Sequence, residues 1–279
     1  MQGVLGRWVD RRLSQAVILN CQGDMADQSK PDTVARFSDR AADYVRFRPT
    51  YPADAVRALL DGLGPPDRVV AADVGAGTGI SARLLGDRGA HVVAIEPSEE
   101  MRRAATPHPN VVWMSGRAEA TGLQSHTLDL VVCAQSFHWF QPAMVLPEFA
   151  RILKPGRRLA IMWNRRSKSD PLTVGYGQAI VDVGGDVSVE RFDFDPRILT
   201  DGGRFSSVER TSFPHFQRLD LEGLIGRARS ASYVPKSGEQ GERLLGLLRA
   251  LHQRHADADG FVTLVYETEI FSAVTADAG

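Results

Sequence analysis

The segment DVGAGTG, from Asp73 to Gly79, constrains the fold of this chain more than any other feature. It follows an apolar run over residues 68–72, which predicts a buried strand, and precedes residues 80–85, which predict a helix. Its alternating glycines let the backbone turn sharply and approach a ligand closely: Gly75, Gly77 and Gly79. A strand, a glycine turn and a helix in this order indicate a ligand-binding α/β fold, and Asp73 suits a ligand with a positive centre.

A second predicted strand, over residues 90–95, ends in an acidic residue, Glu96. In nucleotide-binding α/β folds an acid about 20 residues beyond the glycine turn accepts hydrogen bonds from ribose hydroxyls. The glycine spacing is G-x-G-x-G, whereas the dinucleotide motif is G-x-G-x-x-G and would need glycine where this chain has Ile80. The acid predicts an adenosine-containing ligand, but it does not by itself separate S-adenosylmethionine from NAD.

Further motifs follow in an order that resembles the class I S-adenosylmethionine-dependent methyltransferases. DVGAGTG resembles the methionine-binding loop of that family, and VVAIEP at 92–97 resembles its ribose-binding strand end. GRAE at 116–119 resembles the segment of that family that lies beside the adenine. LDLVVCAQSFHWF at 128–140 resembles its fourth strand, and LKPGRRLAIMWNR at 153–165 resembles the helix, turn and strand that follow. The resemblance implies S-adenosyl-L-methionine as cofactor, with contacts from Asp73, Gly75, Ala76, Gly77, Gly79, Glu96, Pro97, Ala118, Glu119 and Gln135.

An N-terminal signature, ARFSDRAADYVRFRPTYP at 35–52, is similar to that of a small-molecule subgroup that includes trans-aconitate methyltransferase. AQSFHWF at 134–140, SASYVPKSGE at 230–239 and DGFVTLVYETEIF at 259–271 also resemble this subgroup. The resemblance places the N-terminal segment over the cofactor as a lid, with Tyr44 and Arg48 as cofactor contacts. Arg48 is a candidate partner for the cofactor carboxylate or for an acidic acceptor. Candidate contacts to a small-molecule acceptor are Tyr51, His138, Trp139, Trp163 and Asn164.

His138, just beyond the predicted fourth strand, is the candidate catalytic residue. Methyl transfer from a sulfonium is an in-line displacement, so positioning of the acceptor can supply most of the rate. A base is needed only where the acceptor is protonated near pH 7, and an ordinary histidine suits that role. The alternative, which we favour, is that His138 packs against Trp139 and only shapes the pocket.

Strand-like and helical segments alternate from about residue 54 to 165, which predicts crossover connections and a parallel sheet. We expect a Rossmann-like, doubly wound, seven-stranded and mostly parallel α/β sheet with helices on both faces. The strand-like runs at 208–219 and 261–273 fit a C-terminal pair that contains one antiparallel strand. We also expect a flexible leader over residues 1–31 and a single domain over 32–279, with acceptor-side cap elements at about 166–205 and 220–257.

The composition of the chain limits its expected binding partners and its expected location in the cell. A net charge of −1 over 279 residues gives no electrostatic case for nucleic acid. The sequence has no apolar run of about 18 residues, so we expect no membrane span. Cys21 and Cys133 do not suggest a disulfide, which fits the cytoplasm. His215, His252 and His255 do not combine with other ligand types at metal-binding spacing, so we expect no metal.

Two other functions stay open from the sequence: an NAD-dependent oxidoreductase, and an S-adenosylmethionine-binding protein without catalysis. The residues do not identify the acceptor or the oligomeric state.

Overall fold

The computed structural model describes residues 46–184, 193–231, 234–235 and 237–276. The predicted leader over residues 1–31 and the candidate cofactor contact Tyr44 lie outside these ranges.

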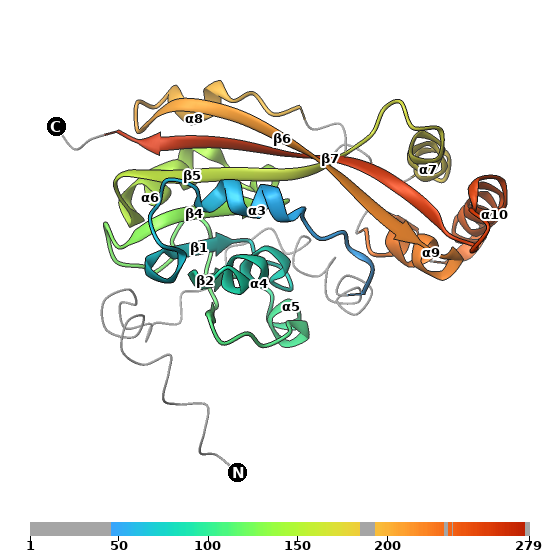
Figure 1. Ribbon diagram of the computed structural model, residues 1–279, viewed down its shortest axis with the longest axis horizontal. Helices are drawn as coiled ribbons and strands as arrows, with labels where there is room; N and C mark the ends of the chain where they lie inside the picture. The colour runs from blue at the N-terminus through green and yellow to red at the C-terminus, as the bar shows by residue number, and fades with distance from the viewer. Residues whose placement is uncertain (1–45, 185–192, 232–233, 236, 277–279) are drawn as a thin grey trace, which may run out of the picture.

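A seven-stranded sheet forms the centre of the molecule, in the order β3-β2-β1-β4-β5-β7-β6 (Figure 1). Strand β7 runs antiparallel to β5 and β6, and the pairs from β3 to β5 are parallel. The predicted sheet with one antiparallel C-terminal strand is therefore confirmed. The strands are β1 (Val70–Val74), β2 (His91–Ile95), β3 (Val111–Met114), β4 (Leu128–Ala134), β5 (Leu153–Arg166), β6 (Phe205–Leu219) and β7 (Val262–Thr275).

Helices cover both faces of this sheet. The central strands are buried on both sides, so they are apolar almost throughout instead of at alternate positions. Helices α3 (Ala53–Leu60) and α4 (Ile80–Asp87) pack on one face, and α6 (Pro142–Ile152) and the short α8 (Arg197–Thr200) on the other. Helix α5 (Glu99–Ala104) follows β2 and is capped by Ser98, whose side chain accepts from the Met101 backbone N–H.

The order of the strands reverses between β1 and β4. From β1 the chain crosses to β2 and β3 on one side, and later returns to place β4 and β5 on the other. In open α/β sheets ligands bind outside the carboxyl ends of the strands at such a switch point. The ends of β1 and β4 therefore mark where the site is expected.

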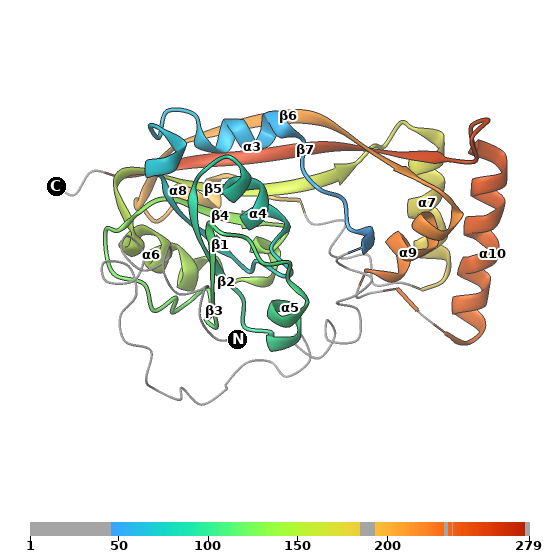
Figure 2. The same ribbon diagram turned by 60° about the horizontal axis from the view of Figure 1, so that its bottom comes forward.

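A separate helical cap extends from one end of the sheet (Figures 1 and 2). It consists of α7 (Pro171–Asp182), α9 (Leu221–Arg229) and α10 (Gly238–His255), and the long strands β6 and β7 connect it to the sheet. The cap helices share a hydrophobic core with the cap ends of these two strands, and this core is distinct from the cores on the two sheet faces. None of the helices in the described part of the chain has the length and apolarity to cross a membrane.

The structure corrects the expected bounds of the cap and locates the expected turn after α6. The expected cap segment at 166–205 is divided: α7 belongs to the cap, whereas Phe194, Leu199 and Phe205 are buried in the core under the sheet beside α6. The turn expected at 154–158 lies inside β5: Leu153 pairs with Leu128 and Arg158 with Leu130, so the register shifts there, and Gly156 has a φ of 68°. Lys154 also forms an ion pair with Asp129 at 2.8 Å, which ties this stretch to β4.

Candidate active site

The loop from Gly75 to Gly79 joins the end of β1 to α4, and its glycines are required by conformation and by space. Gly75, Gly77 and Gly79 have φ values of 70°, 57° and 76°, in the left-handed region that side chains disfavour. A Cβ on Gly75 would lie 2.6 Å from the Ser136 Cβ, and one on Gly79 would lie 2.6 Å from the Trp113 ring. The loop is therefore packed against the end of β4 on one side and against β3 on the other.

Glu96, at the end of β2, holds the glycine loop from within. One carboxylate oxygen accepts from the Gly77 backbone N–H at 2.9 Å, and the other accepts from the Ser98 N–H at 2.9 Å. The carboxylate is buried, which raises its pKa, although these two hydrogen bonds act in the opposite direction. The predicted ribose contact thus lies directly beneath the loop predicted to bind the methionine end.

Asp73 is wholly buried at the end of β1 and turns toward α4. Its Oδ2 accepts from the Ser81 hydroxyl at 2.6 Å. Burial raises the pKa of Asp73 to about 7, and the hydrogen bond from Ser81 opposes that shift. Asp73 does not line the described pocket, whereas Ser81 does. An effect of Asp73 on a ligand would therefore pass through Ser81 or through the loop backbone.

The end of β4 forms the opposite wall. Gln135 has a φ of 59°, and its strained backbone turns the chain into the short helix Phe137–Trp139. The Ser136 hydroxyl donates to the Val74 carbonyl at 2.6 Å, which joins this turn to the start of the glycine loop. Ser136 was not predicted as a site residue; its only sequence signal is its place in the AQSFHWF motif.

His138 lies in the short helix after Gln135, with its ring centroid 4.7 Å from that of Trp139. Burial, together with the charges of Arg48 and Arg165, lowers the pKa of His138 to about 4. The imidazole is therefore neutral at pH 7 and a weak base. Trp139 is 38% exposed, and neither His138 nor Trp139 is among the residues that line the pocket next to Gln135.

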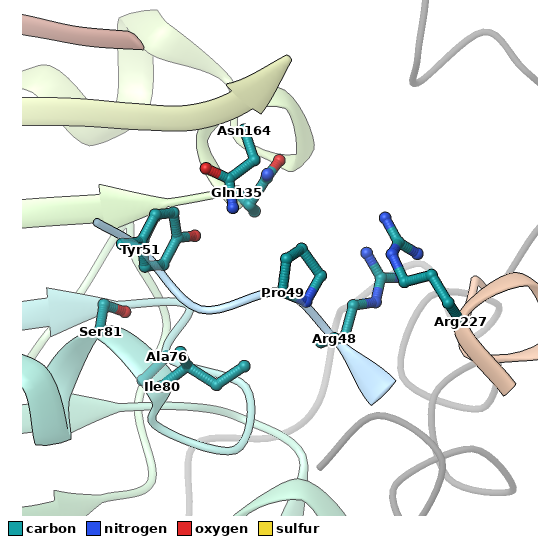
Figure 3. Close-up of a pocket in the computed structure, with 10 residues that line it drawn as sticks. Arg48, Pro49, Tyr51, Ala76, Ile80, Ser81, Gln135, Asn164 and Arg227 are labelled. Atoms are coloured by element: carbon teal, nitrogen blue, oxygen red, sulfur yellow. The ribbon is translucent and has the colours of Figure 1, made fainter. Parts of the chain in front are cut away.

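A pocket lies between the glycine loop, the ends of β4 and β5, and a segment that precedes α3 (Figure 3). Five of the predicted site residues line it: Arg48, Tyr51, Ala76, Gln135 and Asn164. Five further residues line it that sequence analysis did not single out: Pro49, Ile80, Ser81, Ala134 and Arg227. The structure thus brings together residues that are more than 100 positions apart, at the predicted switch point.

The segment Arg46–Tyr51 is fixed over this pocket by contacts with three elements. The Asn164 amide of β5 donates to the Thr50 carbonyl at 2.9 Å, and the Gln217 amide of β6 donates to the Phe47 carbonyl at 2.9 Å. The Phe47 ring lies directly against Gly226 of α9, where a Cβ would be 2.3 Å from it. This segment therefore bridges the sheet and the cap, as expected for the predicted lid.

A family model described as a methyltransferase domain matches residues 72–161. An uncharacterized methyltransferase of Mycobacterium tuberculosis is 34% identical over 256 residues, which cover 89% of this chain and 99% of that protein. This chain belongs to the class I S-adenosylmethionine-dependent methyltransferases. An uncharacterized methyltransferase of Schizosaccharomyces pombe is 34% identical over 190 residues, which cover 67% of this chain and 75% of that protein.

The methyltransferase fold also recurs among solved structures. A protein from Anaeromyxobacter dehalogenans has a TM-score of 0.59 at 23% identity, and the match covers 82% of this chain and 98% of that one. A protein from Anabaena variabilis has a TM-score of 0.57 at 22% identity, covering 81% and 98%.

The residues present fit the methyltransferase cofactor, S-adenosyl-L-methionine. Gly75, Gly77 and Gly79 carry no side chain, so a ligand can approach the loop backbone closely. Glu96 is a buried carboxylate at the strand end where the resemblance places the ribose contact, and the pocket continues from the loop to Gln135. The enzyme class predicted from the sequence is therefore confirmed, and the NAD-dependent alternative is excluded by family.

Several predicted contacts lie outside the described pocket. Trp163 is buried in the sheet core, with Phe194 and Phe271 centroids at 4.9 and 6.1 Å, because it faces the opposite side of β5 from Asn164. Ala118 is buried below β3, and Glu119 forms an ion pair with Arg117 at 3.7 Å. Pro97 is exposed beside Arg102, which donates to its carbonyl. The roles of these residues stay predictions.

Proposed function

We propose that this methyltransferase transfers the methyl group to a small-molecule acceptor held between the glycine loop and the cap. The observation that carries the proposal is one pocket, which is lined by the loop residue Ala76, by Ser81 in the first turn of α4, by the strand-end residues Gln135 and Asn164, and by the covering residue Arg48. Because a segment of the chain crosses over it, the pocket suits a compact acceptor better than a polymer. The acceptor itself would enter from the cap side, where Arg227 lies.

When bound, S-adenosyl-L-methionine would supply a methyl group carried on a positively charged sulfur. The acceptor lone pair would form the new bond to the methyl carbon while the carbon–sulfur bond breaks, and the sulfur would leave as a neutral thioether. The residues of the chain then have three tasks. Glu96 and the loop backbone hold the adenosine and methionine parts, Gln135 and Asn164 orient polar groups, and the segment at Arg48–Tyr51 excludes water. Holding the two reactants in line is worth up to about 7–11 kcal/mol of the barrier.

In this proposal His138 is neutral and acts only through its packing beside Gln135 and Trp139, since it does not line the pocket. A histidine with a pKa near 4 holds a proton poorly at pH 7, so it is a poor base for a weakly acidic acceptor. We expect His138→Gln to keep turnover within about tenfold, because the amide retains polar reach, whereas loss of a general base costs about 10²–10⁴-fold. A thousandfold loss in turnover with unchanged cofactor affinity would instead assign His138 as the base.

Calorimetry with S-adenosylhomocysteine tests the cofactor site. Glu96→Ala removes the acceptor of a ribose hydroxyl and of the Gly77 N–H, so we expect binding to weaken by about 1.5–3 kcal/mol. Glu242→Ala, on the exposed side of α10, is the matched control and should leave the affinity unchanged. Equal affinities in both variants would remove the proposed role of Glu96.

Transfer of radioactivity from methyl-labelled S-adenosylmethionine to a panel of small hydroxylated, carboxylated and aromatic compounds tests the acceptor class. Turnover of a protein or nucleic acid, with none of the small compounds accepted, would contradict the proposal.

A single domain over residues 32–279 after a leader over 1–31, and a cytoplasmic location, stay predictions.

A further inference from the structure

Two arginines from distant parts of the chain meet in the pocket. Arg48 precedes α3, and Arg227 lies in the last turn of α9 in the cap; both line the same space. Figure 3 shows the two side chains pointing toward one another beyond Pro49. The Arg48 guanidinium also donates to the Ser230 carbonyl at 3.1 Å, which holds it beside α9. Arg227 is only 7% exposed, so its charge is largely removed from water.

The ionised side chains that line this pocket are both cationic. Among its described lining residues there is no carboxylate. On neighbouring elements, Glu269 pairs with Arg165 and Arg210, and Glu222 pairs with Arg46. Each guanidinium has five N–H donors, so Arg48 and Arg227 can donate to a bound anion in addition to their contacts within the protein.

A buried hydroxyl lies in the same electrostatic environment. Tyr176 of α7 is fully buried and does not line the pocket, and within the described part of the chain its hydroxyl has no hydrogen-bond partner. The Arg166 guanidinium lies 5.1 Å from the centre of its ring, and the charges of Arg227 and Arg48 act on the same phenol. A buried hydroxyl without a partner is costly unless a ligand supplies one. The cap thus holds a donor that the protein alone does not use.

We propose that the acceptor is a small organic anion, whose carboxylate or phosphate group binds between Arg48 and Arg227, with the Tyr176 hydroxyl as a further donor. This inference rests on the proposed methyltransferase function and adds the chemical class of the acceptor. Guanidinium groups bind both kinds of oxyanion through paired N–H donors. An anionic acceptor also balances the positive sulfonium that the cofactor brings to the same pocket. The alternative ligand for the two arginines is the carboxylate of the cofactor itself, and the variants below distinguish it from an anionic acceptor.

Calorimetry on the full chain saturated with S-adenosylhomocysteine tests the proposal. The probes are benzoate, citrate and glycerol 3-phosphate, with benzamide and glycerol as neutral counterparts. We expect at least one anion to bind and its neutral counterpart to bind at least tenfold more weakly. Citrate and benzoate report the carboxylate class, and glycerol 3-phosphate reports the phosphate class.

Variants then locate the anion. Arg227→Gln should weaken binding of that anion at least tenfold while affinity for S-adenosylhomocysteine stays within about twofold. Arg227→Lys, which keeps the charge but not the paired donors, should have an intermediate effect. Arg249→Gln, with the same change of charge on the exposed side of α10, is the control and should change neither affinity. Tyr176→Phe should weaken anion binding several-fold with an unchanged or higher melting temperature.

Three results would overturn the inference. One is equal binding of an anion and its neutral counterpart, and another is unchanged anion binding in Arg227→Gln and Tyr176→Phe. The third is a loss of S-adenosylhomocysteine affinity in Arg227→Gln that its decarboxylated analogue does not show, because the anion would then be the cofactor's own carboxylate. Failure of the unmodified protein to bind S-adenosylhomocysteine would contradict the proposed cofactor site instead. The anions and their neutral counterparts would then be titrated into the protein alone, and the same comparison would test the inference.

Discussion

At the scale of single residues, the glycine loop shows why a short motif specifies so much. Gly75 needs a positive φ, and it also lies against Ser136, so two separate constraints act on one position. The bond from Ser136 to the Val74 carbonyl keeps the end of β4 close to the loop. A side chain at Gly75 would therefore force apart the two strand ends that form the site.

Gly75→Ala separates these two constraints when it is compared with Gly260→Ala. Gly260 has a φ of +80° but no atom within 4 Å of an added Cβ, so its variant carries backbone strain alone. We expect Gly260→Ala to lower the free energy of unfolding by about 1–2 kcal/mol. Gly75→Ala should cost about 1–3 kcal/mol more because of the contact with Ser136. Urea unfolding measures both, and equal losses would show that the contact relaxes without cost.

Asp73 makes the stability of the fold depend on pH. Its pKa is raised to about 7 in the fold, so between about pH 4 and pH 7 the folded state holds a proton that the unfolded state has lost. Stability from this group is complete below about pH 4 and falls as the pH rises to about 7. Asp73→Asn removes the titration and should keep the Ser81 contact, since the amide oxygen still accepts.

The measurement is urea unfolding of both proteins at pH 5 and pH 8. We expect the unmodified protein to lose up to about 3 kcal/mol more than Asp73→Asn between these two values, from two pKa units at 1.36 kcal/mol each. His138 acts with the opposite sign, because its lowered pKa makes stability rise between about pH 4 and 6.5. That contribution is present in both proteins and cancels in the difference. Parallel pH profiles would contradict a raised pKa at Asp73.

At the scale of elements, the segment before α3 depends on side chains far away in sequence. The Asn164 amide both donates to the Thr50 carbonyl and accepts from the Thr268 hydroxyl at 2.6 Å. Asn164→Asp keeps the second bond and replaces the first with repulsion between two oxygens. We expect opening of this segment to become about 2–10-fold more frequent, the equivalent of one hydrogen bond of about 0.5–1.5 kcal/mol.

Limited trypsin digestion measures this opening through the rate of cleavage between Arg46 and Phe47. Asn110→Asp is the matched control, because the Asn110 amide also donates to a backbone carbonyl, that of Gly86, away from the pocket. Its cleavage rate at Arg46 should equal that of the unmodified protein. Equal rates in both variants would mean that Gln217 and the packing of Phe47 hold the segment without Asn164.

The elements also show how far the sequence leads. Strands β1, β2 and β4 and their glycine loop follow from local apolar runs and turn residues, so the sequence predicts them and the site at their ends. Arg227 could not be found this way, because an arginine in an amphipathic helix has the pattern of an exposed residue. Its burial depends on how the cap meets the segment at Arg48. Trp163 shows a second limit: the sequence places it near a strand end but does not give the face of the sheet, and the pleat of β5 turns its side chain into the core.

At the scale of the whole molecule, the sheet and the cap have separate hydrophobic cores joined mainly through β6 and β7. The proposed cofactor contacts Glu96 and Gly77 belong to the sheet, whereas Arg227 and Tyr176 belong to the cap. Separate cores allow the cap to unfold locally while the sheet stays folded. Cofactor binding and acceptor binding should then respond differently to damage in each core.

Leu248→Ala and Leu85→Ala test this division. Both leucines are fully buried, one in α10 of the cap and one in α4 under the sheet, and each truncation should cost about 2–5 kcal/mol. In Leu248→Ala we expect faster amide hydrogen exchange in α7, α9 and α10, with β1, β2 and β4 still protected. Affinity for S-adenosylhomocysteine should change little, while methyl transfer falls because Arg227 and Tyr176 lose their positions.

Leu85→Ala should instead increase exchange across the sheet and weaken S-adenosylhomocysteine binding. If Leu248→Ala increased exchange equally in the sheet and the cap, the two cores would unfold as one unit, and the acceptor site could not be altered without the cofactor site.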